Sequence, residues 1–307
     1  MYIDTILFSG GAIKGIGFVG CIKALSNYHY LFQIDKIKHY IGTSAGSIVA
    51  TMMAIGYTIQ EIEEIIIKIN LNHIIDINCD NVLELIHKYG IVDGNKFEKT
   101  MRIIIEKITT RDLTFLELYQ LYGKKLTINA VSIKDKKNEY FNYINTPHLN
   151  ISTAVRMSCC VPILFQPYQY NNKLYVDGCL MDSISVNQIE TDKFIGFYVE
   201  DNQIPTINNI FDFLQMITHC ATYQMNNYKI NDNVNKIHSL DFTDVQSLNF
   251  SLNKDDKLKI INSAYQSTLN FIENKYLKYN SFYLKYDDNK VENTINHIYL
   301  IDLIYIQ

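Results

Sequence analysis

Residues 40–47 read YIGTSAGS, and this stretch decides the fold. We interpret it as the end of a buried strand, a sharp turn and the start of a helix. Ser44 stands at the apex of a Gly-x-Ser-x-Gly pattern, a geometry that presents a serine hydroxyl as a nucleophile. Gly42 and Gly46 flank it because larger side chains would crowd the turn. A helix over residues 45–55 would direct its free amides and positive dipole end toward an oxyanion beside Ser44.

A glycine-rich loop precedes this turn. Residues 3–8 form a short apolar run typical of a buried parallel strand, and residues 9–15 read SGGAIKG. Three ligand-binding interpretations of the loop are open: a dinucleotide site, a P-loop, or amides that stabilise an oxyanion. Ala12 breaks the dinucleotide pattern, and Lys14 is followed by glycine instead of Ser or Thr. A tight turn without a ligand is the remaining alternative.

The composition excludes several classes of protein. The chain has 307 residues, 48% of them hydrophobic, which is enough for a large core. Its net charge of -4 predicts no nucleic-acid partner. The start lacks the pattern of a signal peptide and no run of about twenty apolar residues is present, so we expect a cytoplasmic protein without a transmembrane helix. The cysteines and histidines show no metal-ligand spacing, and we expect no metal and no cofactor.

The rest of the chain alternates between predicted strands and helices, which indicates an α/β fold. Capping boxes at Thr58 and Thr114 predict two further helix starts. The further predicted strands cover residues 37–43, 125–132, 139–144, 173–177, 193–199 and 237–242. The further predicted helices cover residues 81–88, 96–107, 151–159, 207–228 and 254–276.

A carboxylate follows one of the later strands. Asp177 ends the predicted strand and Gly178 permits a turn directly after it. In an open parallel sheet the carboxyl ends of the strands gather along one edge, where binding sites form. We therefore expect Ser44, the glycine loop and Asp177 to meet, although they are far apart in the sequence.

These three motifs, in this order, resemble those of the patatin-like phospholipases, and the resemblance covers roughly residues 3–200. Residues 9–15 are similar to the family's glycine-rich oxyanion motif. Residues 42–46 are similar to its nucleophile motif, and residues 177–179 to its Asp-Gly-Gly or Asp-Gly-Ala motif. The heavy use of Asn, Ile, Lys and Tyr is typical of an A+T-rich genome, such as that of a virus or microbe.

The resemblance implies a three-layer α/β fold with a central, mostly parallel sheet flanked by helices. It also implies a Ser-Asp dyad without a histidine. Ser44 would attack an acyl ester and form an acyl-enzyme, and Asp177 would accept the serine proton and later help to activate water. Residues 1–200 would be the catalytic domain, and residues 201–307 a mostly helical part of the same compact unit.

The implied oxyanion hole lies in the glycine loop. Amides around Gly10, Gly11 and Ala12 would hold the oxyanion, while Lys14 would add positive potential and Gly15 completes the motif. Two residues depart from the family pattern. Ala12 replaces a third glycine, and the loop tolerates the added methyl group at some cost in fit. Cys179 replaces Gly or Ala after Gly178 and is small enough to fit, although its thiol is open to oxidation.

The implied substrate is a phospholipid, reached by transient contact of a peripheral protein with a membrane surface. Neutral glycerides, galactolipids and acyl thioesters stay open. A candidate docking patch consists of five apolar residues, for which a core-facing helix stripe is the alternative. They are Ile204, Pro205, Phe211, Phe213 and Leu214.

Other functions remain open as alternatives. His219, His238 and His297 follow Asp177, so a Ser-Asp-His triad in the order of the α/β-hydrolases is formally possible. That triad would make the chain an esterase or thioesterase. The fold could also serve as a non-catalytic lipid-binding module. The sequence offers no positive feature for a purely structural partner.

Overall fold

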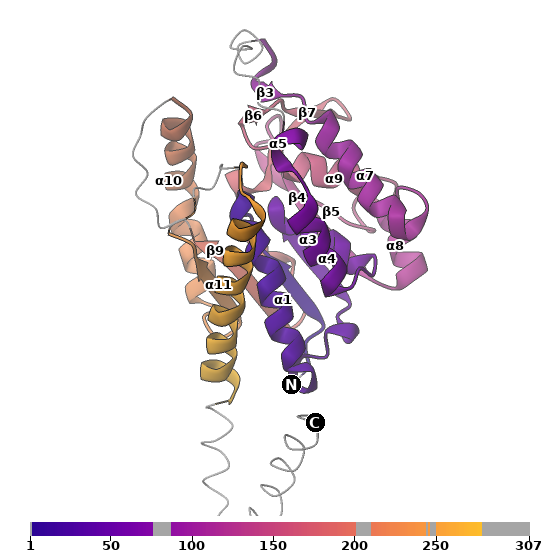
Figure 1. The fold of residues 1–307 in the computed structure, drawn as a ribbon. Coiled ribbons are helices and arrows are strands. Elements are labelled where there is room, and N and C mark those ends of the chain that lie inside the picture. The colour runs from indigo at the N-terminus through magenta and orange to yellow at the C-terminus, as the bar shows by residue number, and fades with distance from the viewer. Residues whose placement is uncertain (1, 76–86, 201–209, 244, 246–249, 278–307) are drawn as a thin grey trace, which may run out of the picture.

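The computed structural model describes residues 2–75, 87–200, 210–243, 245 and 250–277. Within these residues an eight-stranded sheet forms the centre of the molecule, with the order β10-β9-β1-β2-β4-β8-β7 and β5 paired to β4 (Figure 1). Its strands are β1 Thr5–Phe8, β2 His39–Thr43, β4 Lys125–Ser132, β5 Lys137–Phe141, β7 Tyr168–Tyr170, β8 Lys173–Asp177, β9 Phe194–Glu200 and β10 Ile237–Asp241. The short strands β3 Gly90–Val92 and β6 Ile163–Phe165 pair separately.

Helices flank this sheet (Figure 1). The α-helices are α1 Phe18–Asn27, α2 His29–Phe32, α3 Ala45–Ala54, α4 Ile59–Lys68, α5 Leu71–Ile74, α7 Asn95–Thr109, α8 Phe115–Tyr122, α9 Ile151–Ser158, α10 Ile210–Asn231 and α11 Lys254–Ile272. The short 3-10 segments are η1 Ala12–Gly17, η2 Ile34–Lys36, η3 Gly178–Leu180 and η4 Val186–Gln188, and η5 Glu273–Leu277 is a π-helical turn. In the described part of the chain, no helix combines the length and the apolar character needed to cross a lipid bilayer.

The predicted fold class is confirmed. Strands β10, β9, β1, β2 and β4 run parallel to their neighbours in this series, while β8, β7 and β5 join the sheet antiparallel. Both predicted capping boxes are present, at Thr58 before α4 and Thr114 before α8. The predicted helix over residues 81–88 lies outside the described residues. The glycine loop enters α1 through η1, which the sequence did not predict.

All four residues of strand β1 are buried. Alternate side chains of a strand point to opposite sides of the sheet, so β1 is covered on both faces. Ile6 and Phe8 belong to the larger core, which also takes in the inner sides of α1 and α3. Leu7 faces the other way, into a smaller cluster with Ile184 that Ile230 of α10 covers. A continuous apolar strand therefore lies at the middle of the sheet, directly before the glycine loop.

The strand that carries Asp177, β8, runs antiparallel to β4, in a sheet that is otherwise mostly parallel. Strand β4 pairs Asn129 with Thr43 of β2 and the next residue, Ala130, with Asp177 of β8. Because these two pairs are adjacent on β4, Asp177 stands level with the end of β2. The chain brings Asp177 and Ser44 to one edge of the sheet from opposite directions.

Helix α11 packs closely on α1. A methyl group built on Gly20 of α1 would lie 2.1 Å from the carbonyl oxygen of Ile261 and 2.7 Å from the amide nitrogen of Tyr265. Such distances require direct contact between the two helix backbones. We propose that α11, far along the chain, unfolds together with the catalytic domain.

We therefore expect Gly20→Ala to lower the free energy of unfolding by about 1–3 kcal/mol, because α11 must move away from α1. Urea unfolding followed by circular dichroism measures this. The matched control is Ser26→Ala on the same helix. The Ser26 hydroxyl donates to the Lys23 carbonyl oxygen at 2.7 Å. A C-terminal part that unfolds in a separate transition would contradict the single unit.

Candidate active site

Ser44 sits in a strained turn between β2 and α3. Its backbone has φ 49° and ψ -123°, a region that non-glycine residues rarely occupy and that costs about 1–3 kcal/mol. The Ser44 amide donates to the Ser158 hydroxyl at 2.8 Å, and the Ser47 hydroxyl donates to the Ser44 carbonyl oxygen at 2.6 Å. These two hydrogen bonds hold the serine in the strained conformation.

The flanking glycines allow this turn to form. A methyl group on Gly42 would lie 2.5 Å from the Gly46 carbonyl oxygen, and one on Gly46 would lie 2.4 Å from the Phe8 carbonyl oxygen. Both distances are far shorter than van der Waals contact. The start of α3 can therefore approach β1 and β2 only with glycine at these positions.

Asp177 contacts Ser44 directly. The Ser44 hydroxyl donates to Asp177 Oδ2 at 2.5 Å, and the Cys179 amide donates to Oδ1 at 2.8 Å. Ser44 is 4% exposed and Asp177 is 2% exposed. Burial raises the pKa of Asp177 to about 6, against the lowering effect of the hydrogen bonds from Ser44 and Cys179. The carboxylate is thus mostly ionised at neutral pH and able to accept the serine proton.

The glycine loop lies against the serine, but its first amide is already bonded. A methyl group on Gly10 would be 3.4 Å from Ser44 Cβ and 1.9 Å from Cys179 Sγ. The Gly10 amide donates to the Ser183 carbonyl oxygen at 2.9 Å. This hydrogen bond occupies the Gly10 amide in the present structure, so the role of Gly10 as an oxyanion donor stays a prediction.

The next two amides remain as candidate donors. In the described part of the chain, the amides of Gly11 and Ala12 have no hydrogen-bond acceptor. Ala12 and Ser44 line the same cavity. Ala12 has φ 47°, a left-handed conformation that costs a non-glycine residue about 1–2 kcal/mol. The backbone thus explains why a glycine would fit this position better.

Lys14 and Gly15, the last two residues of the predicted loop motif, are packed against neighbouring parts of the chain. Lys14 is 1% exposed and lies outside the cavity lining, and its amide donates to the Gly11 carbonyl oxygen at 3.0 Å. A methyl group on Gly15 would lie 2.7 Å from Ala45 Cβ, so this glycine lets η1 approach the start of α3.

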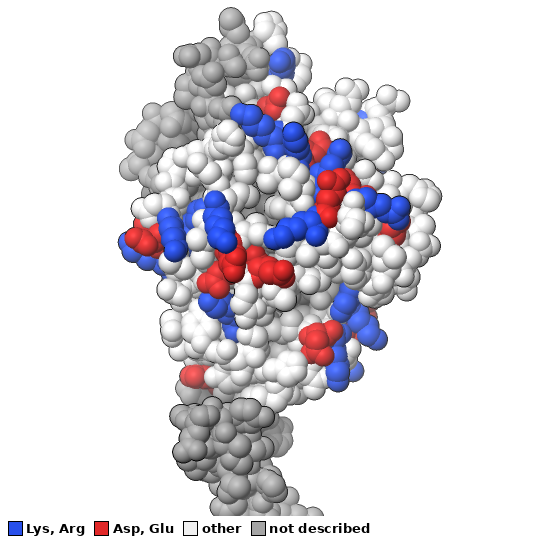
Figure 2. Space-filling view, turned by 45° about the vertical axis from the view of Figure 1, so that its right-hand side comes forward, with Lys and Arg blue, Asp and Glu red and all other residues white. Residues whose placement is uncertain are grey.

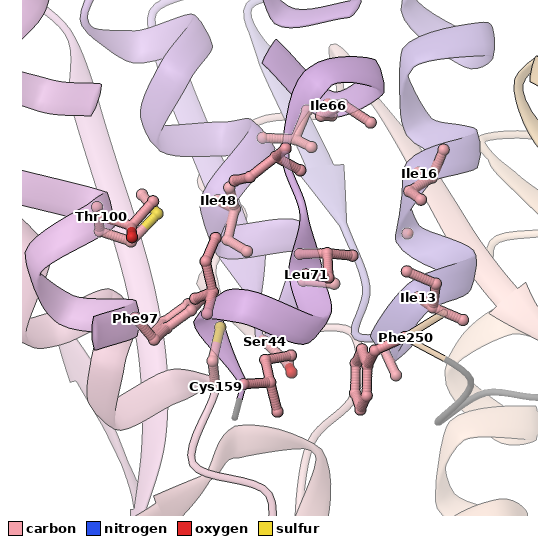
Figure 3. A pocket seen from close by; sticks show the side chains of 18 of the residues that line it. Ile13, Ile16, Ser44, Ile48, Ile66, Leu71, Phe97, Thr100, Cys159 and Phe250 are labelled. Carbon is pink, nitrogen blue, oxygen red and sulfur yellow. The ribbon is translucent and has the colours of Figure 1, made fainter. Parts of the chain in front are cut away.

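An apolar cavity of about 140 Å³ extends from Ser44 (Figure 3). Among the described residues that line it, only Ser44, Thr100 and Cys159 carry a hydroxyl or thiol, and the others have apolar side chains or are glycine. Thr100 Oγ1 donates to the Lys96 carbonyl oxygen of its own helix at 2.8 Å. The cavity wall therefore suits a hydrocarbon chain.

The sequence did not reveal this cavity. The isoleucines at positions 65, 66 and 69 were a visible signal, since they share one apolar face of a predicted helix. Such a face is typical of ordinary core packing. Only the arrangement of α3, α4 and α7 around Ser44 leaves a space between these side chains. The sequence also did not assign to the site Ser158, whose hydroxyl accepts the Ser44 amide.

No described histidine side chain hydrogen-bonds Ser44 or Asp177. Asp177 accepts its hydrogen bonds from Ser44 and Cys179. His238 lies on β10, where its ring bonds the Ser267 hydroxyl at 3.1 Å and stacks on Phe271. Burial lowers the pKa of His238 to about 4. The side chain of His219 and all of His297 lie outside the described residues.

The family model of patatin-like phospholipases matches residues 6–189, which include the serine turn, the glycine loop and Asp177. The chain belongs to the patatin-like phospholipase family. Membership in this family supports lipid ester hydrolase activity.

Two viral relatives and one solved structure extend this result. The chain is 27% identical over 271 residues to the probable lipid hydrolase 463L of Invertebrate iridescent virus 6, across 85% of this chain and 89% of that one. It is 32% identical over 225 residues to protein R571 of Acanthamoeba polyphaga mimivirus, across 69% of this chain and 73% of that one. The crystal structure of VipD from Legionella pneumophila aligns with a TM-score of 0.65 at 14% identity, across 89% and 67%, which shows likeness of fold alone.

The buried carboxylate predicts a pH-dependent cost in stability. Between pH 3.8 and about 6 the unfolded chain has released a proton that folded Asp177 still holds, so the free energy of unfolding falls as pH rises. The full loss, reached above pH 6, is about 3 kcal/mol. We expect Asp177→Asn to be more stable than wild type by about 1–3 kcal/mol at pH 8, and by less at pH 5.

Urea unfolding at pH 5, 6, 7 and 8 measures this difference. Asp192→Asn is the control, because that carboxylate is exposed. A stability difference that stays constant over this pH range would contradict the raised pKa of Asp177.

Proposed function

We propose that the protein hydrolyses fatty acyl esters of phospholipids through a Ser44–Asp177 dyad and an acyl-enzyme. The observation that carries this proposal is the 2.5 Å hydrogen bond from Ser44 Oγ to Asp177 Oδ2 at the end of an apolar cavity. A hydroxyl bonded to a buried carboxylate has a base to take its proton. The cavity offers the acyl chain a place beside the reacting atom.

The reaction has two halves. Ser44 Oγ passes its proton to Asp177 Oδ2 and attacks the ester carbonyl carbon. The amides of Gly11 and Ala12, with the N-terminus of α3, hold the oxyanion. The tetrahedral adduct then expels the lysolipid alkoxide, which takes the proton from Asp177, and the acyl group stays on Ser44. In the second half Asp177 takes a proton from water, and the water oxygen attacks the acyl carbon. The adduct expels Ser44 Oγ, which takes the proton back from Asp177 as the fatty acid is released.

A carboxylate is a weak base toward serine, and burial strengthens it. The usual pKa of an Asp side chain is 3.8, and burial raises that of Asp177 to about 6. A base with a pKa closer to the working pH accepts a proton more readily in the transition state. The Cys179 amide donates to Asp177 Oδ1, and Asp177 Oδ2 accepts the hydrogen bond from the Ser44 hydroxyl.

Transient contact with a lipid surface brings the substrate to Ser44. Phe213, a member of the predicted docking patch, is 45% exposed, and Ile217 one turn further along α10 is 50% exposed. For Phe213 this exposure favours the docking patch over the core-facing alternative. Ile204 and Pro205 of the predicted patch lie outside the described residues, as do the side chains of the other two members. On the face in Figure 2, positive and negative side chains lie close together, so contact there does not rest on one sign of charge.

Lipid-product profiling tests the proposed function. We expect wild-type protein to release free fatty acid and lysophospholipid from mixed phospholipid vesicles, and Ser44→Ala to lower the rate by about 10³-fold or more. Vesicles that also contain triacylglycerol identify the preferred ester. Lipid binding without any product, in both proteins, would favour a non-catalytic lipid-binding module.

The histidine variants separate a dyad from a triad. We expect His238→Ala and His219→Ala to keep the hydrolysis rate within about threefold of wild type, whereas loss of a general base typically lowers it 10²–10⁴-fold. Circular dichroism controls for folding. A folded histidine variant without activity would support the triad instead.

A further inference from the structure

The dipeptide Asp182-Ser183 connects the loops of the site. The Ser183 carbonyl oxygen accepts the Gly10 amide at 2.9 Å. The Asp182 carbonyl oxygen accepts the Asn129 side-chain amide at 3.1 Å and the Thr43 hydroxyl at 3.5 Å. Gly10 begins the glycine loop and Thr43 directly precedes Ser44. The position of this dipeptide therefore affects both the oxyanion loop and the serine turn.

The side chains of the same dipeptide are held by α10. Lys229 forms an ion pair with Asp182, whose carboxylate is buried, and Asn226 donates to the Ser183 hydroxyl at 3.1 Å. Tyr140 of β5 donates to the second carboxylate oxygen of Asp182 at 2.8 Å. Helix α10 lies at the side of the sheet near β9 (Figure 1), beyond the residues that the family model matches.

We propose that Lys229 and Asn226 are positioning residues, through which α10 sets the oxyanion loop for hydrolysis. The chain of contacts runs from α10 to the dipeptide, from Ser183 to Gly10, and from Gly10 to the adjacent amides of Gly11 and Ala12. The inference rests on the proposed function, because it assigns these amides to the oxyanion.

The burial of Asp182 makes this link sensitive to Lys229. A buried carboxylate that loses its cation is left uncompensated, and the backbone around it moves toward water or another partner. Movement of Ser183 removes the acceptor of the Gly10 amide and releases the loop. Misplaced oxyanion donors slow the chemical step, since their bonds are strongest in the transition state. Substrate binding in the apolar cavity does not involve the dipeptide.

Steady-state kinetics on a short, soluble p-nitrophenyl ester test the proposal. We expect Lys229→Met to lower kcat by about 10–100-fold and to leave KM within about twofold, because removal of a whole oxyanion donor lowers kcat about 10²–10³-fold. Lys229→Arg keeps the cation and restores kcat to within about threefold. Asn226→Ala breaks a neutral hydrogen bond and provides a milder variant, with an expected decrease of about threefold to tenfold.

Lys236→Met is the matched control. Lys236 pairs with the exposed Asp192 at 3.3 Å, shortly after α10 and away from the dipeptide. We expect its kcat and KM to equal those of wild type. Unchanged kcat in folded Lys229→Met and Asn226→Ala would overturn the proposal, and so would a decrease that Lys229→Arg fails to reverse.

Hydrogen exchange of the peptide that contains residues 10–17 gives a readout without turnover. We expect faster exchange in Lys229→Met than in wild type or Lys236→Met. If wild type hydrolyses no ester and this exchange still responds, the proposed function fails while the link from α10 to the loop stands. If wild type is active and the exchange is unchanged, the link fails alone.

Discussion

The hydrogen bond between Ser44 and Asp177 joins residues 133 positions apart, and the rest of the site supports it. Strand β2 leads into the serine turn from one direction and β8 brings the carboxylate from the other, with β4 between them. The register of β4 with both neighbours places the two side chains level. The flanking glycines then let α3 begin immediately after Ser44.

This arrangement combines several unfavourable local terms. Ser44 holds a strained backbone, Ala12 has a left-handed conformation, and Asp177 is buried with a raised pKa. They persist because the strands and helices around them are well packed, with β1 buried on both faces and α11 in backbone contact with α1. Strain at a site of reaction is typical of proteins that trade some stability for activity. Helix α10 contributes to the same balance by compensating the buried Asp182.

The sequence predicted the parts of this structure that depend on local chemistry. The serine turn, the capping boxes at Thr58 and Thr114, and the end of β8 at Asp177 each have a short, specific pattern. It did not predict features that depend on contacts between distant segments. The direction of β8 follows from its pairing with β4, and the acceptor of the Gly10 amide is the carbonyl oxygen of the distant Ser183. The cavity likewise requires several helices, each of which alone has an ordinary apolar face.

The reaction of Ser44 with a fluorophosphonate tests the dyad most directly, because this reagent phosphonylates activated serines. Peptide mass spectrometry over pH 4–9 gives the site and the rate. We expect one adduct, on Ser44, at a rate that rises with pH through an apparent pKa of about 6, as Asp177 ionises. We expect Asp177→Asn to lower this rate by about 10²-fold or more. Equal labelling of Ser44 in wild type and Asp177→Asn would contradict the role of Asp177 as the base.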